Sequence, residues 1–504
     1  MFKYLSDLGV LTTDSSGTDI SFDAVLGKPA EQCLRYYRRN VRDYIKGMFP
    51  ANEDDGTTLL NGFSLNAENT DHNYVFKKIL QRFKDYERDP NGGRLVGIDK
   101  DFKSRLFEDF LKGSVGQRSL GQFFTPRRLM AGIVDMANVE ALPNGSRIGD
   151  PACGVGGFPL EAASRRAARL RRNDFRIEMQ ERGQGRSRTV EPVVVCDIEY
   201  RGYDKGSDRQ DDNLTIILAK ANFVIYQSDL LSAHPEATRA VAEMFNGIFR
   251  AYTDTSLGSL AEIEEGSYDL VLSNPPYVAS GSANLKEAAR RQGLRYDAGG
   301  TGVEGLFIEK IVRELRPDGR AFVILPDGIF LRDADSRLRR WIAEECFVDG
   351  IVSLPVRTFF ATSKKTYVLC LTKKRKRAEP QTHPVFAYVV TAIGETLDAA
   401  RFPVPESDMP EMARLFRGFV SSKPRLPEET EALAHLTSPK LKFVDADVLF
   451  ASSTWTVDRL WSKQERIALG IHEEQPTLSE EEFFGALKGI RDGISALLEN
   501  GHAG

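Results

Sequence analysis

The sequence contains few cysteines and histidines, and none of them are grouped. The five cysteines are odd in number and lie far apart, and neither a CxxC pair nor a Cys/His cluster occurs. A disulfide framework and a structural zinc site are therefore not indicated. The six histidines are equally scattered, so we expect no metal at the functional site.

Long apolar runs and an excess of positive charge are also missing. No stretch approaches the ~18 apolar residues of a membrane span, and the first residues, MFKYLSDLGV, lack the apolar core of a signal peptide. We therefore expect a cytoplasmic protein with no membrane partner. Lys and Arg (68) against Asp and Glu (72) give a net charge of −4, which excludes a general basic coat for nucleic acid.

One segment departs from this balance. Residues 164–188 hold nine arginines and three acidic residues. Such a run fits a surface that contacts phosphates and, equally well, a solvated helix face. A second basic run, KKRKR at 373–377, follows an apolar strand pattern and is predicted to be a surface turn.

Hydrophobic spacing divides the chain into three predicted parts. Residues 1–115 form a helical N-terminal domain, in which the spacing predicts helices over 30–48, 73–87 and 101–111. Residues 116–380 form a domain of alternating strands and helices, which is typical of a parallel α/β sheet. Residues 381–504 form a C-terminal extension for contact with a partner or DNA, ending in a helix at 479–499. The predicted strands are 146–150, 193–197, 200–204, 223–228, 268–273, 320–325, 349–354 and 366–372, and the predicted helices are 126–139, 157–171, 209–222, 303–315 and 334–345.

A glycine-dense turn, IGDPACGVGGF at 148–158, follows the first of these strands and opens a helix. Glycine is needed where the backbone takes a positive φ or approaches a ligand closely. In open α/β sheets the ligand crevice lies at the carboxyl ends of the strands. The spacing matches neither the dinucleotide fingerprint nor the triphosphate loop. The turn therefore indicates either another ligand or a tight strand–helix connection.

A second motif, YDLVLSNPPYV at 268–278, places a polar side chain and a rigid diproline at a strand end. Proline removes backbone donors and leaves its carbonyl free to accept. The amide oxygen of Asn274 and the carbonyl of Pro275 can accept both hydrogens of an exocyclic amine. The ring of Tyr277 offers a stacking face for a planar base. A proline-terminated strand with a packed tyrosine is the structural alternative.

Three ordered motifs together resemble a known family. GQFFTPRRL (121–129), DPACGVGGF (150–158) and SNPPY (273–277) are similar to the motifs of gamma-class amino-methyltransferases of DNA. More closely, the chain looks like the modification subunit of a type I restriction–modification system, over roughly 116–375. The resemblance implies a Rossmann-like α/β sheet dependent on S-adenosyl-L-methionine, with a helical N-terminal domain and a C-terminal extension.

The resemblance also implies which residues hold that cofactor. The segment Gln122 to Pro126 would pack on its methionine part, although Thr125 with Pro126 also reads as an ordinary helix start with Thr125 as N-cap. The family usually has Thr or Ser where this chain has Val155, so one hydrogen bond is expected to be missing. The implied cofactor residues of the two segments are Gln122, Phe123, Phe124, Thr125, Pro126, Asp150, Ala152, Cys153, Gly154 and Gly156.

Two further carboxylates complete the implied cofactor site. Asp204 fits the residue that accepts from the ribose hydroxyls, with Asp197 as its competitor one strand earlier. Asp229, followed by Leu230, resembles the residue that accepts from the adenine amino group. Its structural alternative is an N-cap or loop aspartate.

The activity implied by the resemblance is methyl transfer from S-adenosyl-L-methionine to adenine N6 in DNA, after the base is flipped out of the duplex. Asn274, Pro275, Pro276 and Tyr277 would be the catalytic segment, and Phe359 or Phe360 would stack on the other face of the base. The expected partners are double-stranded DNA and a separate specificity subunit, with a restriction subunit as a further candidate. Alternatives are methylation of RNA adenine, cytosine N4 or protein glutamine, and a DNA-clamping assembly subunit whose methylation is secondary.

Overall fold

The structure is a computed structural model that describes most of the chain. The described residues are 1–59, 65–89, 93–97, 124–182, 189–206, 214–253, 255–278, 281–359, 362, 364–398, 401–423 and 431–471. The chain divides into two units, Met1–Val457 and Asp458–Gly504. In the second unit, helix α18 (Lys463–Ala468) begins with a capping box formed by Ser462 and Glu465. The predicted closing helix at 479–499 lies outside the described residues.

The N-terminal residues are helical, as predicted. The helix predicted at 30–48 is a continuous helical run, because a π-helical stretch, Tyr37–Arg42, joins two α-helices. The helix predicted at 73–87 is confirmed, and the one at 101–111 lies outside the described residues. The α-helices here are α1 (Phe2–Asp7), α2 (Phe22–Leu26), α3 (Ala30–Tyr36), α4 (Asp43–Met48) and α5 (Thr70–Arg88).

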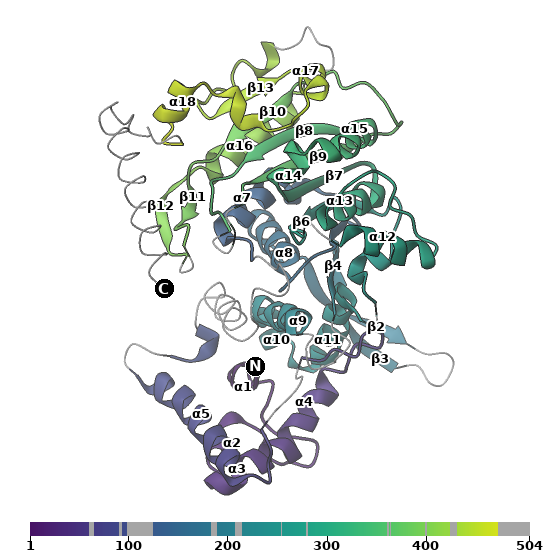
Figure 1. The fold of residues 1–504 in the computed structure, drawn as a ribbon. Helices are drawn as coiled ribbons and strands as arrows, with labels where there is room; N and C mark the ends of the chain where they lie inside the picture. The colour runs from purple at the N-terminus through teal and green to yellow at the C-terminus, as the bar shows by residue number, and fades with distance from the viewer. Residues whose placement is uncertain are drawn as a thin grey trace, which may run out of the picture. The chain divides into compact units, whose positions relative to one another are not determined.

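A nine-stranded sheet forms the centre of the first unit (Figure 1). Its strand order is β13-β10-β8-β9-β7-β6-β1-β4-β5. The order reverses between β1 and β6, and in α/β sheets such a switch point opens a crevice at the carboxyl ends of the strands. The strands are β1 (Arg147–Asp150), β4 (Glu199–Lys205), β5 (Phe249–Tyr252), β6 (Tyr268–Ser273), β7 (Leu315–Pro326), β8 (Cys346–Ser353), β9 (Thr366–Lys373), β10 (Val385–Val389) and β13 (Leu441–Val444).

The prediction of a parallel sheet is correct for most strand pairs and wrong for β9, and β13 is an additional antiparallel strand that was not predicted. β9 runs antiparallel to both β7 and β8, and β13 runs antiparallel to β10. The described residues between β8 and β9 contain no helix, whereas a parallel pair is usually joined through a crossover helix. The sheet continues through β10 beyond residue 380, and the three-part division of the chain stays a prediction.

Helices cover the sheet, and most begin and end near their predicted positions. α7, α8 and α9 pack in succession, with α16 against α7, while α13 contacts α15. No described helix is long and apolar enough to cross a membrane. The helices are α7 (Arg127–Ala137), α8 (Gly157–Leu170), α9 (Leu214–Tyr226), α10 (Ser228–Ala233), α11 (Thr238–Ile248), α12 (Ser282–Arg291), α13 (Val303–Glu314), α14 (Asp327–Leu331), α15 (Ser336–Glu345), α16 (Met409–Ser421) and α17 (Ala446–Ala451).

The strand predicted at 223–228 is wrong. These residues form the end of α9 and the start of α10. Ile216 to Ile225 are buried almost without interruption. A short apolar run of this kind reads equally as a buried strand or a buried helix. The strand that follows β4 is instead β5, a four-residue segment.

Two small antiparallel hairpins lie outside the central sheet. One pairs β2 (Phe175–Arg182) with β3 (Thr189–Cys196), so the strand predicted at 193–197 exists but is not part of the main sheet. The other pairs β11 (Ile393–Glu395) with β12 (Pro403–Ser407).

A segment of the N-terminal part docks on the edge of the sheet. Asp55 accepts a hydrogen bond of 2.6 Å from the backbone N–H of Ala251 in β5. Lys220 of α9 donates to the hydroxyl of Thr57 at 2.5 Å. Lys220 is fully buried, and burial lowers its pKa to about 8. The segment is therefore fixed by specific polar contacts with the strand–helix layers.

Candidate active site

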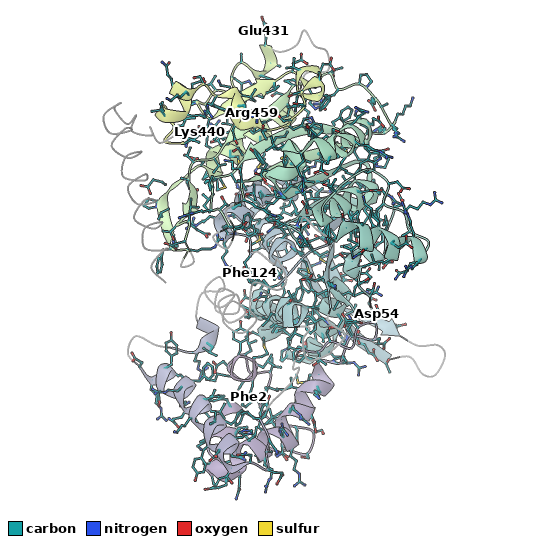
Figure 2. The ribbon with its side chains drawn as sticks, in the orientation of Figure 1. Phe2, Asp54, Phe124, Glu431, Lys440 and Arg459 are labelled. Atoms are coloured by element: carbon teal, nitrogen blue, oxygen red, sulfur yellow. The ribbon has the colours of Figure 1, made fainter. Side chains whose placement is uncertain are left out.

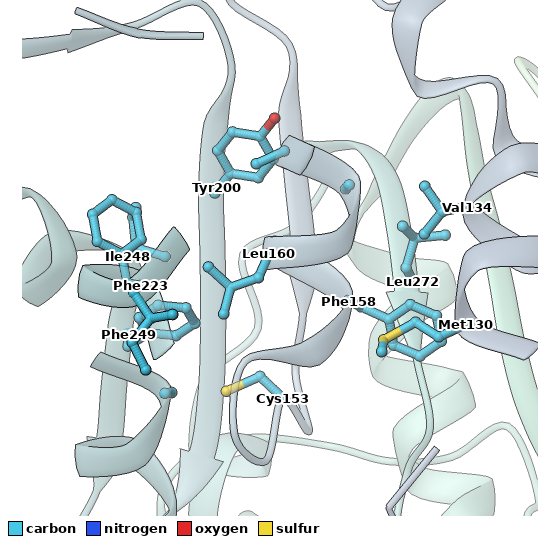
Figure 3. Packing of buried hydrophobic residues seen from close by; sticks show 14 of the residues in the cluster. Met130, Val134, Cys153, Phe158, Leu160, Tyr200, Phe223, Ile248, Phe249 and Leu272 are labelled. Atoms are coloured by element: carbon cyan, nitrogen blue, oxygen red, sulfur yellow. The ribbon is translucent and has the colours of Figure 1, made fainter. Parts of the chain in front are cut away.

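The glycine turn between β1 and α8 is held at the carboxyl edge of the sheet. The Cys153 N–H donates to the carbonyl of Tyr203 in β4, at 2.9 Å. Gly154 and Gly156 have φ values of +55° and +79°, which side chains with a Cβ rarely adopt. A Cβ on Gly156 would lie 2.8 Å from the Phe249 ring. Glycine is required here by both backbone and packing, and Figure 3 shows Cys153 in this core.

Two carboxylates flank the turn at the ends of neighbouring strands. Asp150 ends β1, and its Oδ1 accepts from the Ser273 hydroxyl at 2.7 Å and from the Ala152 N–H at 3.1 Å. Asp204, near the end of β4, accepts from the Lys205 N–H at 2.7 Å, and its carboxylate lies close to the backbone of Gly154. These partners are all neutral, and within the described residues no cation pairs with either carboxylate.

Burial removes both carboxylates from solvent, and no cation within the described residues offsets the loss. Desolvation raises the pKa of Asp150 to about 7 and that of Asp204 to about 6. Charge repulsion between the two groups adds to the shift of Asp150. Because structural carboxylates in buried sites are normally paired, this arrangement is typical of a site that binds a cationic or hydroxyl-rich ligand.

The two candidates for the ribose contact lie at opposite ends of β4. Asp204 faces the glycine turn, whereas Asp197 precedes the strand, and its carbonyl accepts from Gly145, before β1. The Asp197 carboxylate pairs with Arg172 and Arg176, each at 2.8 Å. Asp197 is thus engaged in surface ion pairs away from the carboxyl edge, and the geometry favours Asp204.

The NPPY segment follows β6 at the same edge. Asn274 is half-buried, and its Nδ2 donates to the Thr125 hydroxyl at 3.1 Å. Its Oδ1 accepts from the hydroxyl of Tyr277. Tyr277 is buried, and desolvation raises the pKa of its hydroxyl far above its usual value. The amide is therefore oriented by one hydroxyl on each side.

An aromatic partner for Tyr277 is also present. The rings of Tyr277 and Phe359 meet edge to face, with centroids 5.8 Å apart and planes 88° apart. Phe359 is predicted to stack on the face of the target base opposite Tyr277, and the structure places the two rings in contact. Its role in stacking on a base stays a prediction, and Phe360 lies outside the described residues.

The start of α7 differs from the sequence expectation. Pro126, not Thr125, is the N-cap, and no side chain of the N-cap residue closes the helix. The Thr125 hydroxyl is instead the acceptor for Asn274. Glu395 of β11 takes the capping position, because its Oε1 accepts from the Arg128 N–H at 2.7 Å. Sequence reasoning missed Glu395, which lies 267 residues away along the chain.

A pocket joins these elements. Phe124, labelled in Figure 2, lines it together with residues from β1, the glycine turn, α8 and the NPPY segment. Gln122 and Phe123 lie outside the described residues. Of the predicted cofactor residues, the pocket lining includes Phe124, Thr125, Asp150, Ala152, Cys153 and Gly154, and it also includes Val155 and Asn274.

Asp229 and Leu230 are not at a strand end. Asp229 lies exposed in the first turn of α10, so the strand on which its predicted adenine contact rested is absent. In the sheet the corresponding position follows β5, where the sequence continues Thr253, Asp254. Asp254 lies outside the described residues. The adenine contact of Asp229 stays a prediction without its structural basis.

The arginine-rich segment contains both buried and surface residues. Arg166 is 2% exposed and pairs with Asp174 at 3.0 Å. It also donates to three backbone carbonyls before β1. Within the 373–377 run, Arg375 and Arg377 form surface ion pairs, in agreement with the predicted surface turn.

Comparison with known proteins places these features in a family. The chain matches the family described as N-6 DNA Methylase over residues 99–437. It is 23% identical over 276 residues to the type I restriction enzyme EcoEI methylase subunit of Escherichia coli, covering 54% of this chain and 47% of that protein. The chain thus spans about half the length of the curated relatives it matches.

Two solved structures have a similar fold. A chain from the structure of an assembled type I restriction–modification system matches with a TM-score of 0.54 and 17% identity, covering 99% of this chain and 90% of that one. The methyltransferase subunit of a type I system from Streptococcus thermophilus matches with a TM-score of 0.52 and 17% identity, covering 88% and 92%. The predicted Rossmann-like α/β methyltransferase fold is confirmed. Because the family match extends over more than half of the chain, the protein belongs to the N-6 DNA methylase family.

Proposed function

We propose that this chain transfers a methyl group from S-adenosyl-L-methionine to the N6 amine of adenine in DNA, as the modification subunit of a type I-like restriction–modification or phage-defence system. The observation that carries the proposal is the position of Asn274. Its amide lines the same pocket as the glycine turn and Asp150, at the switch point of the sheet. A target amine held there would lie beside the cofactor.

The residues that line the pocket, together with Asp204 on the neighbouring strand, fit the chemistry of S-adenosyl-L-methionine. The cofactor carries an ammonium group and two ribose hydroxyls, and its sulfonium supplies the methyl group. Asp150 is suited to the ammonium end, since its carboxylate has only neutral partners. Asp204 is suited to the ribose hydroxyls as a strand-end carboxylate. Gly154 has open space where a Cβ would stand, which allows the backbone to approach the ligand.

Asn274 would bind the target amine from the other side. Its Nδ2 is committed to Thr125, which leaves Oδ1 as the acceptor for one amine hydrogen, and the Pro275 carbonyl accepts the second. The hydroxyl of Tyr277 now bonds to that Oδ1, so the incoming amine replaces or shares this contact. Holding both hydrogens favours a tetrahedral nitrogen, and the lone pair becomes available to the methyl group. Positioning of this kind supplies most of the expected rate.

The aromatic pair must open to admit the base. A base stacked between two rings needs about 7 Å between them, from two contacts of about 3.5 Å, whereas the Tyr277 and Phe359 centroids are 5.8 Å apart at a right angle. We therefore expect one of these side chains to rotate when the flipped base enters. Extruding the base costs a few kcal/mol, which binding to the protein must offset.

The charge of the chain supports a separate DNA-reading partner. A net charge of −4 gives no general attraction to phosphates, which supplies most non-specific affinity for DNA. We propose that a specificity subunit provides sequence recognition and that the chain alone binds DNA weakly. A restriction subunit is a further partner of the assembled system.

The deciding experiment is a methylation assay with the purified chain, alone and with a candidate specificity subunit from the same organism. Labelled cofactor and genomic duplex DNA are supplied, and the modified nucleoside is identified by mass spectrometry. We expect N6-methyladenine only in the presence of the partner. The variant Asn274→Ala should bind the cofactor with unchanged affinity and lose methylation by at least about a hundredfold.

Other products would contradict the assignment. N4-methylcytosine, methylated RNA or methylated protein under the same conditions would replace adenine in DNA as the substrate. Full activity of Asn274→Ala would remove the NPPY segment from the reaction. Tight, sequence-specific methylation by the chain alone would show that no separate reader is needed.

A further inference from the structure

The β11–β12 hairpin contacts two separate parts of the active site. Glu395, in β11, accepts a hydrogen bond of 2.7 Å from the backbone N–H of Arg128, at the start of α7. Arg401, just before β12, donates through Nη2 to the carbonyl of Thr358 at 2.9 Å. The hairpin belongs to the segment beyond residue 380, to which the sequence assigned no role in the site.

Both contacts lie next to residues of the proposed reaction. Arg128 is three residues from Thr125, which accepts from the amide of Asn274. Thr358 immediately precedes Phe359, whose ring packs on Tyr277, and Tyr277 donates to Asn274. The contacts therefore form a closed ring. It runs from the hairpin through the start of α7 and the NPPY segment to Phe359, and it returns to the hairpin through Thr358.

The first contact is well suited to hold its helix. The first N–H groups of a helix have no partner inside the helix, and the N-cap of α7 supplies no side-chain acceptor. A carboxylate at this end also interacts favourably with the helix dipole. Glu395 is 9% exposed, so its contact with Arg128 is shielded from water.

The spacing of the two contacts is fixed within the hairpin. The Thr396 N–H donates to the Phe402 carbonyl, and the Phe402 N–H donates to the Thr396 hydroxyl, both at 2.9 Å. Thr396 follows Glu395 directly, and Phe402 follows Arg401 directly. The two contacting residues are thus locked at one separation by the hairpin itself.

We propose that Glu395 and Arg401 are positioning residues that set the distance between the two walls of the active site. Glu395 holds the start of α7, which lies beside the proposed cofactor pocket. Arg401 holds the carbonyl of Thr358, next to Phe359, on the side proposed for the target base. This inference rests on the proposed function. Neither residue touches the reacting atoms.

Separate kinetic effects test the two roles. Glu395→Ala should weaken cofactor binding by about tenfold, which is the size of effect typical for loss of a hydrogen bond to a charged group. Glu395→Gln should restore most of the cofactor affinity, because an acceptor remains. Arg401→Ala is expected to lower kcat by about tenfold with the cofactor Kd unchanged, and Arg401→Lys should recover part of the rate. Glu406→Ala is the matched control, since Glu406 is an exposed carboxylate on the same hairpin.

The measurements are calorimetric titration of S-adenosyl-L-methionine with the full chain, steady-state methylation with its partner, and thermal unfolding. The positioning role is wrong if both alanine variants unfold at lower temperature while cofactor Kd and kcat stay at wild-type values. It is also wrong if both variants change the same parameter equally. A wild-type chain that methylates no DNA would contradict the proposed function alone, because the cofactor Kd of Glu395→Ala would still decide the role of Glu395.

Discussion

Thr125 and Asn274 share a hydrogen bond of 3.1 Å, although 149 residues separate them in the chain. In this arrangement the Nδ2 end of the Asn274 amide faces Thr125, whose hydroxyl accepts from it. The amide oxygen is consequently directed to the other side, toward Tyr277. The segment before α7 and the NPPY segment therefore act as one unit, with the first orienting the second.

Thr125→Val tests this orientation. Valine has nearly the same shape and lacks the acceptor, so the Asn274 amide can rotate and present either end to the target. We expect kcat to fall by about tenfold, for the loss of one hydrogen bond of about 1–1.5 kcal/mol, with stability nearly unchanged. Thr125→Ser keeps the hydroxyl and should retain most of the rate. Equal rates for the valine and serine variants would contradict the orienting role.

The pH dependence of cofactor binding follows from Asp150 and Asp204. Their pKa values are raised to about 7 and about 6, so in the free protein both carboxylates take up protons as pH falls through this range. A cationic ligand favours the charged forms, and binding below pH 7 must release protons. We expect affinity for S-adenosyl-L-methionine to rise between pH 5.5 and pH 8. Calorimetry in two buffers counts the protons, and a Kd independent of pH would contradict the assignment.

The raised pKa values of Asp150 and Asp204 affect the stability of the ligand-free protein in the opposite direction, since this stability falls as pH rises. Because the folded-state pKa values of both carboxylates lie above their ordinary value, the folded protein without ligand holds more protons than the unfolded chain between about pH 4 and pH 7. Their contribution to stability is complete below pH 4 and is lost as pH rises through 6 and 7. Asp150→Asn should remove its share of this dependence.

Asp204→Ala and Asp197→Ala separate the two candidates for the ribose contact. Loss of Asp204 removes a charged acceptor from the carboxyl edge and should cost on the order of 1.5–3 kcal/mol of cofactor binding. Loss of Asp197 breaks ion pairs with Arg172 and Arg176, which are partly exposed, and should leave cofactor affinity unchanged. Calorimetric titration of both variants decides the assignment. Weak binding by Asp197→Ala alone would reverse it.

Alanine at Gly154 and Gly156 should have different effects. At Gly156 the new methyl group would meet the Phe249 ring at 2.8 Å with φ at +79°, so we expect a loss of roughly 3 kcal/mol in stability. At Gly154 a Cβ has open space. The cost there is about 1 kcal/mol of backbone strain, together with weaker cofactor binding. Denaturant unfolding and cofactor titration of both variants would show whether the effects separate.

Lys220→Met should change how stability depends on pH. The folded-state pKa of Lys220 is lowered to about 8, so between pH 8 and about 10.5 the unfolded chain holds a proton that the folded protein lacks. Stability therefore rises across this range, and the burial penalty of roughly 3 kcal/mol applies in full only below pH 8. The methionine variant should lose this rise, whereas the exposed Lys46→Met should keep it. Urea unfolding at pH 7, 8.5 and 10 measures the difference.

The sequence predicted which motifs follow strands at the carboxyl edge of the sheet, because these motifs are local. Asp150 with the glycine turn, and Asn274 with its prolines, each follow a strand whose apolar pattern is unambiguous. The order of strands then brings them together, since β1 and β6 are neighbours. The position of the β11–β12 hairpin beside the site could not be predicted from local sequence patterns. Glu395 and Arg401 are ordinary charged residues in a weakly patterned segment.

The errors in assigning strands have separate physical causes, namely burial, strand length and the length of a connection. The helix predicted at 209–222 is present in α9, but its last turn is buried, and a short buried apolar run does not distinguish a helix from a strand. β5 has only four residues, which is too few for a strand pattern to register. The antiparallel position of β9 left only a weak signal, because the connection of residues 354–365 is near the shortest length that a parallel crossover allows.

The contact between Asp55 and Ala251 has a consequence for the solubility of the sheet. β5 is the last strand of the sheet on its side, and an edge strand with free N–H groups is a template on which another chain can add a strand. Asp55 occupies the Ala251 N–H with a carboxylate at 2.6 Å, and the segment that carries it lies along this border. A chain that lacks residues 1–59 would leave the edge strand β5 exposed. Such a chain should associate with itself through this strand into extended sheets.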